Sequence, residues 1–263
     1  MAARRTVRQT VRVHSIERLS GRVWLYPGDA DAANIQGSVA VITGDDGSVV
    51  VDAGHSPAVG SLVRRAMREA GLPDARWLVY THHHWDHTWG ARAWDGVEII
   101  GHASGAEILG EEAKRPWSEE YLRAGMVADP LLEPSYSARI RAMAGSWEGF
   151  AILPPTRVFT DSLTLPYDVE VRHVGGGHAP DSTVVVVPDA SVMLLGDSFY
   201  APPFHVRKAD DTTDLAMVRR FLSEGYEWYV DSHSPPRRRG GWSAAAGLMT
   251  ATGRFRRRPR GES

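Results

Sequence analysis

Imidazole and carboxylate groups are concentrated in one short segment of the sequence. The segment reads Thr81-His82-His83-His84-Trp85-Asp86-His87 and directly follows an apolar run at 77–80. Such a run predicts a strand, and side chains alternate along an extended chain. We therefore expect His82, His84 and Asp86 to project to one side, and His83 and Trp85 to the other. Two imidazoles on one side can share a metal ion, whereas the alternative is a surface cluster of histidines.

The composition limits what this segment can do. The 263 residues include no cysteine, which excludes disulfides, thiolate catalysis and cysteine ligands. Any metal must therefore be held by nitrogen and oxygen. The net charge of −2, from 30 basic and 32 acidic residues, gives no indication of a nucleic acid or a membrane as partner. A hydrophobic content of 43% is typical of a globular chain.

The segment at 82–87 resembles the HxHxDH signature of the metallo-β-lactamase superfamily, and further motifs follow in that family's order. They are Asp52 in Val-Val-Val-Asp-Ala-Gly, His178 in Gly-Gly-Gly-His-Ala-Pro-Asp-Ser, Asp197 in Gly-Asp-Ser and His233 in Asp-Ser-His-Ser. The resemblance spans residues 22 to about 234. It implies an α/β fold, specifically a four-layer αββα sandwich with metals at one edge between the two sheets.

The same resemblance implies two metal ions per chain. The first would be held by His82, His84 and His178. The second would be held by Asp86, His87 and His233, with Asp197 between the two ions and Asp52 supporting the ligands from outside. Neutral imidazoles and carboxylates suit Zn²⁺, although the set also tolerates iron or manganese.

The distribution of apolar residues predicts a mixed α/β domain at 1–240. Strands are expected at 23–26, 39–43, 49–52, 77–81, 97–100, 169–174, 183–187, 192–196 and 227–231. One helix should begin after Ser56 and end at Gly71, and another should begin near Thr213 and end before Gly225. Residues 241–263 read as a basic, flexible tail. Without an apolar leader after Met1 or a long apolar span, we expect a cytoplasmic monomer or homodimer.

Residues 104–150 read as a helical insertion between the first ligands and His178. This segment carries more apolar and aromatic surface than a solvated loop needs, so we expect either a mobile cover over the metals or packing against the sandwich or a second subunit. Under the first reading its aromatic side chains contact the substrate. The predicted pocket residues are Trp117, Tyr136, Trp147 and, outside the insertion, His205.

The function implied is hydrolysis by a metal-bridging hydroxide, with Asp86 orienting the nucleophile and delivering a proton. Tyr200 lies three residues after Asp197, as in acyl-homoserine-lactone lactonases, where a tyrosine donates to the substrate carbonyl; a core tyrosine is the alternative. We expect an ester, lactone or thioester of a small metabolite as substrate. A β-lactam hydrolase, a phosphodiesterase or nuclease, a mononuclear iron dioxygenase and an inactive binding protein of the same fold are the alternatives.

Overall fold

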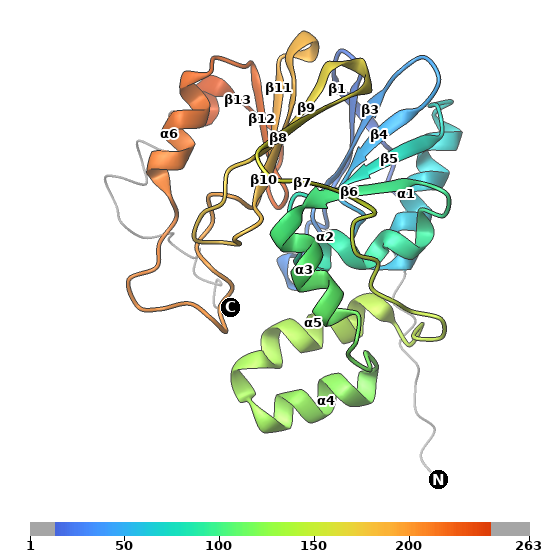
Figure 1. Cartoon of the computed structure of the whole chain (residues 1–263), viewed down its shortest axis with the longest axis vertical. Helices are drawn as coiled ribbons and strands as arrows, with labels where there is room; N and C mark the ends of the chain where they lie inside the picture. Colours follow the sequence, from blue (N-terminus) through green and yellow to red (C-terminus); the bar gives the residue numbers. More distant parts are fainter. Residues whose placement is uncertain (1–13, 243–263) are drawn as a thin grey trace, which may run out of the picture.

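Two β-sheets lie face to face in the computed structural model, which describes residues 14–242 (Figure 1). The first sheet has the strand order β1-β2-β3-β4-β5-β6-β7, and the second has the order β13-β12-β11-β10-β9-β8. The strands of the first sheet are β1 (Glu17–Ser20), β2 (Val23–Tyr26), β3 (Val39–Thr43), β4 (Ser48–Val51), β5 (Ala75–Val79), β6 (Glu98–His102) and β7 (Arg157–Phe159). Those of the second are β8 (Ser162–Leu165), β9 (Val169–His173), β10 (Thr183–Val187), β11 (Val192–Gly196), β12 (Trp228–Asp231) and β13 (Arg237–Arg238).

Helices cover the outer faces of both sheets. They are α1 (Pro57–Glu69), α2 (Trp85–Thr88), α3 (Ala103–Glu112), α4 (Glu119–Ala128), α5 (Glu133–Met143) and α6 (Leu215–Ser223). In Figure 1, α6 lies on the outer side of the second sheet, α1 lies on the outer side of the first sheet, and α4 and α5 lie at the bottom of the view, below both sheets. The observed layers confirm the predicted αββα sandwich with a helical insertion.

Three apolar clusters hold these layers together. Valines and leucines of both sheets meet in the central cluster, where Val51, Val79 and Leu194 are almost fully buried. The second cluster joins α1 and the insertion to the first sheet, and the third joins α6 to the second sheet. A strand buried on both faces needs apolar residues along its length, and β10 has four consecutive buried valines, at 184–187.

The parallel pairs of strands position the site. In the first sheet β4, β5, β6 and β7 run parallel, and in the second sheet β11 and β12 do so. Loops that leave the carboxyl ends of parallel strands meet at one edge of their sheet, which is where such folds bind ligands. Asp52 follows β4, Thr81 and His82 lie beyond β5, Asp197 follows β11, and His233 lies beyond β12.

Local sequence explains the two helices that the sequence predicted. The Ser56 hydroxyl accepts a hydrogen bond from the Val59 amide, and Pro57 occupies the first turn of α1. Gly71 follows this helix with a φ of 68°, a conformation that costs glycine little. The second helix, α6, is capped by Asp214 and not by Thr213, because the Asp214 carboxylate accepts from the Met217 amide at 2.8 Å.

Four strands were not predicted from the sequence: β1, β7, β8 and β13. Each has four residues or fewer, and most of their positions are exposed or only partly buried. No apolar run marks them, because all four lie at the ends of their sheets: β1 and β7 in the first, β13 and β8 in the second. Their formation depends on pairing with neighbours and not on local sequence.

The insertion packs most of its aromatic side chains inward. Trp117 and Trp147 lie against Trp89, with ring centroids 5.2 Å and 6.0 Å away, and Tyr136 is 8% exposed in the same cluster. Trp89 belongs to the chain segment just beyond the ligand residues. The large apolar surface of the insertion is therefore covered by the sandwich itself.

The predicted tail lies outside the described residues except for its first two. Trp242, the second of these, is buried against Phe199 and donates its indole N–H to the Tyr229 carbonyl at 3.0 Å. No helix between residues 14 and 242 has the length and apolar character that crossing a membrane requires.

We predict that Gly90→Ala strongly destabilises the protein. A Cβ at Gly90 would lie 2.0 Å from the Ala53 carbonyl oxygen, and both partners of that clash are backbone. The two segments also share the Gly90 to Gly54 hydrogen bond of 2.8 Å, so neither can move alone. We expect the free energy of unfolding to fall by about 3 kcal/mol or more, measured by chemical denaturation.

Gly110→Ala is the matched control. A Cβ at Gly110, within α3, would meet no atom within 4 Å. Alanine favours a helix interior, so this variant should gain about 0.5–1 kcal/mol. Equal effects of the two substitutions would contradict the close approach of the two segments.

Candidate metal centre

Three imidazole nitrogens converge at the end of β5. His82 Nε2 lies 2.8 Å from His84 Nδ1, which in turn lies 3.0 Å from His178 Nε2. His82 and His84 come from the loop after β5, and His178 comes from the loop between β9 and β10. The three side chains form one of the two groups whose geometry could hold a metal ion.

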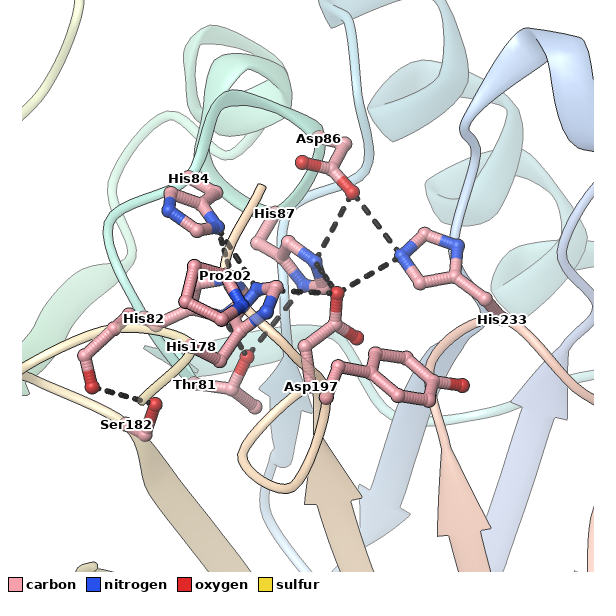
Figure 2. Close-up of polar contacts among 12 residues, drawn as sticks. Thr81, His82, His84, Asp86, His87, His178, Ser182, Asp197, Pro202 and His233 are labelled. Atoms are coloured by element: carbon pink, nitrogen blue, oxygen red, sulfur yellow. Dashed lines mark hydrogen bonds and ion pairs between the residues drawn. The ribbon is translucent and has the colours of Figure 1, made fainter. Parts of the chain in front are cut away.

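Four further side chains form the second group beside the first: Asp86, His87, Asp197 and His233. Asp86 Oδ2 lies 3.1 Å from His87 Nε2 and 3.2 Å from His233 Nε2. Asp197 Oδ2 lies 3.2 Å from His233 Nε2 and 3.5 Å from His178 Nε2, so one carboxylate oxygen stands between the two groups (Figure 2). The structure thus brings together all seven residues that the sequence predicted as ligands.

The route by which Asp86 reaches the site differs from the prediction. β5 ends at Val79, residues 81–83 form bends, and His84, with a φ of −60° and a ψ of 148°, precedes the first turn of α2. The strand therefore does not continue through the motif: the loop after β5 places His82 and His84, and the helical turn places Asp86 and His87. His83 is not among the ligands: its Nδ1 lies 2.7 Å from the Asp181 carboxylate, and its ring packs against that of His84 with the centroids 4.6 Å apart.

The unsatisfied atoms of the site fit a metal ion. His87 Nε2 and Asp197 Oδ1 are buried and have no hydrogen-bond partner among the described residues. Buried polar atoms are normally paired, so those that are not require an explanation. Imidazole nitrogens and carboxylate oxygens are also the donors that zinc and related divalent metals prefer. A bound cation would supply the missing partner for both atoms.

The two groups differ in their electrostatics. Burial lowers the pKa of His82, His84 and His178, with the charge of neighbouring histidines adding to the effect at His82 and His84. These three imidazoles are therefore neutral at pH 7, the form that binds a metal. In the second group burial acts against the charged form, yet the Asp86 carboxylate raises the pKa of His87 well above its usual value. Asp197 similarly raises the pKa of His233 to about 10.

Asp52 fixes the orientation of the second group. Its Oδ2 accepts hydrogen bonds from His87 Nδ1 at 2.7 Å and from the Thr81 hydroxyl at 3.0 Å, while Oδ1 accepts from the Thr81 amide at 2.8 Å. His178 is held in a comparable way, because its Nδ1 donates to the Ala201 carbonyl at 3.0 Å. Such contacts leave the other ring nitrogen free to face a metal. Asp52 therefore lies where the sequence predicted it.

Tyr200 has a partner that the sequence did not indicate. Its hydroxyl donates to Asp231 Oδ1 at 2.9 Å, and the same oxygen accepts from the His233 amide at 3.0 Å. Tyr200 also lies along the wall of the cavity that contains the ligands. The predicted role at the oxyanion stays a prediction, and in this structure the hydroxyl proton is directed to Asp231.

A cavity of about 700 Å³ opens over both groups of ligands. Of the four residues predicted to line it, His205 does so, whereas Trp117, Tyr136 and Trp147 pack beneath the insertion and are not in its wall. The insertion contributes Leu131, one of the apolar side chains expected to face the substrate, and also Glu112 and Arg139, which sequence reasoning missed. Arg139 belongs to no recognisable motif, and a single arginine in a helical segment is normally predicted to be a solvated surface residue.

The chain is similar to proteins of one family. The model of the metallo-beta-lactamase superfamily matches residues 32–233. No curated protein matches the chain by sequence.

Solved structures with similar folds are metallo-beta-lactamases. One from Erythrobacter litoralis, with beta mercaptoethanol in the active site, is 18% identical with a TM-score of 0.59, over 90% of this chain and 96% of that one. One from Hirschia baltica is 16% identical with a TM-score of 0.60, over 89% and 97%. The mono-zinc form of FIM-1 from Pseudomonas aeruginosa is 16% identical with a TM-score of 0.57, over 90% and 95%. At these identities the likeness shows the fold alone.

We predict that Asp52→Asn weakens metal binding at the second group. An asparagine keeps the size of the side chain and tolerates the φ of 66° at this position, but its amide can present a donor to His87 Nδ1 and so disfavour the tautomer that faces a metal. We expect about a 10- to 100-fold loss of affinity for one of two metal equivalents, measured by competition with a chelator. Asp181→Asn, which alters the partner of His83, is the control and should change metal affinity little.

Proposed function

This chain belongs to the metallo-beta-lactamase superfamily. From that premise we propose that it is a hydrolase whose single active site binds two metal ions, and that both ions are zinc. The observation that carries the proposal is the position of Asp197 Oδ2 between the two ligand groups, 3.5 Å from His178 Nε2 and 3.2 Å from His233 Nε2. A single carboxylate in that position suits two adjacent cations. His82, His84 and His178 would hold one ion, and Asp86, His87 and His233 the other.

When bound, such a pair of ions supplies a nucleophile at neutral pH by acidifying water, and polarises the bond to be cleaved. The chain's own residues position the reaction. Asp52 and the Ala201 carbonyl hold His87 and His178 in fixed orientations. Burial works against an ionised carboxylate at Asp86, but His87 and His233 keep its pKa well below the usual range. The carboxylate is therefore ionised, and its Oδ2 can accept a hydrogen bond from the attacking group and so orient it.

We propose an ester, lactone or thioester of a small metabolite as the substrate. The support is the cavity, whose volume of about 700 Å³ is in the range of small-molecule sites. Its wall combines apolar side chains such as Leu131 and Phe204 with the ligand residues and further polar side chains. The net charge of −2 does not favour a nucleic acid as substrate. β-Lactams belong in the same test, because the scissile bond of a lactam is also an acyl bond.

Metal content and hydrolysis test this proposal together. We expect about two metal ions per chain by elemental analysis and about one after His87→Ala or His233→Ala, because each change removes a ligand of the second group. His173→Gln is the control, since His173 bonds the Pro180 carbonyl and stacks on His102 outside both groups. The wild type should hydrolyse at least one member of a panel of lactones, thioesters, esters, β-lactams and phosphodiesters.

Two results would contradict the proposal. The first is that the wild type binds one metal ion or fewer per chain and that the His87 and His233 variants bind no less. The other is full metal loading without hydrolysis of any acyl compound, which would favour a binding protein. Hydrolysis confined to phosphodiesters would keep the metal centre and replace the substrate class.

The substitution Tyr200→Phe tests whether Tyr200 acts at the oxyanion or stabilises the fold. This change leaves the buried Asp231 oxygen without its phenolic donor, so we expect a loss of about 1–3 kcal/mol in the free energy of unfolding. It should leave kcat/KM on the best substrate within about a factor of ten, because one oxyanion donor is worth about 100-fold or more. A fall of 100-fold with unchanged stability would instead support the oxyanion role that the sequence predicted.

A further inference from the structure

Arg139 of α5 lies in a cage of aromatic rings next to the metal centre. Its guanidinium carbon is 5.1 to 5.6 Å from the centroids of four rings: Tyr136, Trp89, Trp117 and Trp85. Two of these residues, Trp117 and Tyr136, are ones that the sequence predicted as substrate contacts. In the structure they surround a cation instead.

The cage does not satisfy the hydrogen-bonding capacity of Arg139. Aromatic faces attract a cation but accept hydrogen bonds poorly, and a guanidinium has five N–H donors. Its Nε is buried without a partner, and among residues 14–242 no carboxylate or carbonyl bonds either terminal nitrogen. Glu112 faces the same cavity and favours the charged guanidinium, but it forms no ion pair with it. A charged donor group left in this state needs an acceptor from elsewhere.

That acceptor would come through the substrate cavity. Arg139 lines the same cavity as the ligands Asp86 and His233. Burial lowers the pKa of Arg139, and Asp86 is among the groups that favour its charged form. Arg139 in turn adds to burial in lowering the pKa of His205. His205 is thus a neutral imidazole that can donate one hydrogen bond without adding charge.

Exposed apolar side chains lie around the same cavity. Leu131 is 55% exposed, Phe204 is 64% exposed and Val206 is 57% exposed, and all three line this cavity. Exposed large apolar side chains gathered at a cavity are typical of a binding surface. Arg207 also lines the cavity, but it is exposed and its Nε donates to the Pro202 carbonyl at 2.8 Å, so Arg139 is the buried cation that an anionic part of a bound molecule would meet.

We propose that Arg139 binds a carboxylate of the substrate that is separate from the bond to be cleaved. The inference rests on the proposed function, because it assumes that the reacting group of the substrate lies at the metal ions. A guanidinium fork matches the two oxygens of a carboxylate, and one buried cation whose charge is partly offset by Glu112 suits a monoanion better than a phosphate dianion. The substrate class is therefore an acyl compound with an apolar body and a free carboxylate.

Dicarboxylates test this clamp without requiring hydrolysis. The probes are the α,ω-dicarboxylates from succinate to pimelate, each compared with the monocarboxylate of the same chain length. One carboxylate can bind the metal ions and the other Arg139. Binding to the metal-loaded protein is measured by calorimetry. For at least one chain length we expect the dicarboxylate to bind about 10- to 100-fold more tightly than its monocarboxylate, which is the worth of a charged hydrogen-bonded pair.

Variants of Arg139 test whether this residue causes the preference for dicarboxylates. Arg139→Gln should abolish it and leave the affinity for the monocarboxylates unchanged. Arg139→Lys keeps a positive charge within the cage but cannot form two parallel hydrogen bonds, so it should keep part of the preference for dicarboxylates. If the Arg139→Gln protein does not fold, the lysine variant still tests the proposal. Arg123→Gln is the matched control, because Arg123 is an exposed arginine of the same insertion that pairs with Glu119. It should retain the full preference.

The outcomes separate the two proposals. No dicarboxylate preference at any chain length in the wild type, or a preference that survives Arg139→Gln, overturns the clamp and leaves Arg139 as a structural cation. Tighter binding of inorganic phosphate than of every dicarboxylate, lost in Arg139→Gln, replaces the carboxylate by a phosphate. A preserved clamp in a protein that hydrolyses nothing would overturn the hydrolase and keep the binding site.

Discussion

Two buried carboxylate oxygens, Asp86 Oδ2 and Asp197 Oδ2, each lie 3.2 Å from the same nitrogen of His233. Carboxylates that share so small a space away from water repel each other unless positive charge lies between them. The protein gathers that charge from His87 and His233, whose pKa values are raised by these same carboxylates. Metal cations bound to the neutral imidazoles would replace the charge of those protons. A fold that concentrates charge in this way has to hold every member rigidly, because any outward relaxation lowers the repulsion.

Backbone contacts and both sheets share that task. Asp52, at the end of β4, binds the Thr81 amide and His87, and the Ala53 amide donates to the His87 carbonyl at 2.7 Å. The first sheet therefore holds one side of the site through main-chain geometry as well as side chains. The second sheet delivers Asp197 from the end of β11 and His233 from beyond β12. Because the ligands come from both sheets, the site forms only when the central apolar cluster brings the sheets together.

The parts of this structure that the sequence predicted are those with a strong local signal. Apolar runs such as 39–43, 183–187 and 192–196 identified strands to the residue, and the ligand motifs identified all seven converging side chains. The missed elements depend on distant partners. β13 has two residues and exists through its pairing with β12, and the Tyr200 hydroxyl has its partner 31 residues away at Asp231. Neither pairing leaves a periodic trace in the sequence.

Arg139 shows why the substrate end of the site was harder to predict than the metal end. Metal ligands need particular residue types at fixed spacings, so a family resemblance finds them, whereas a recognition residue needs only a surrounding that three-dimensional packing creates. The rings around Arg139 come from α2 and the turn after it, from the loop before α4, and from α5 itself. The sequence indicated an aromatic insertion but not that its rings face a cation. The same aromatic surface that anchors the insertion to the sandwich thereby holds an unpaired guanidinium at the cavity, and packing and recognition are performed by one set of side chains.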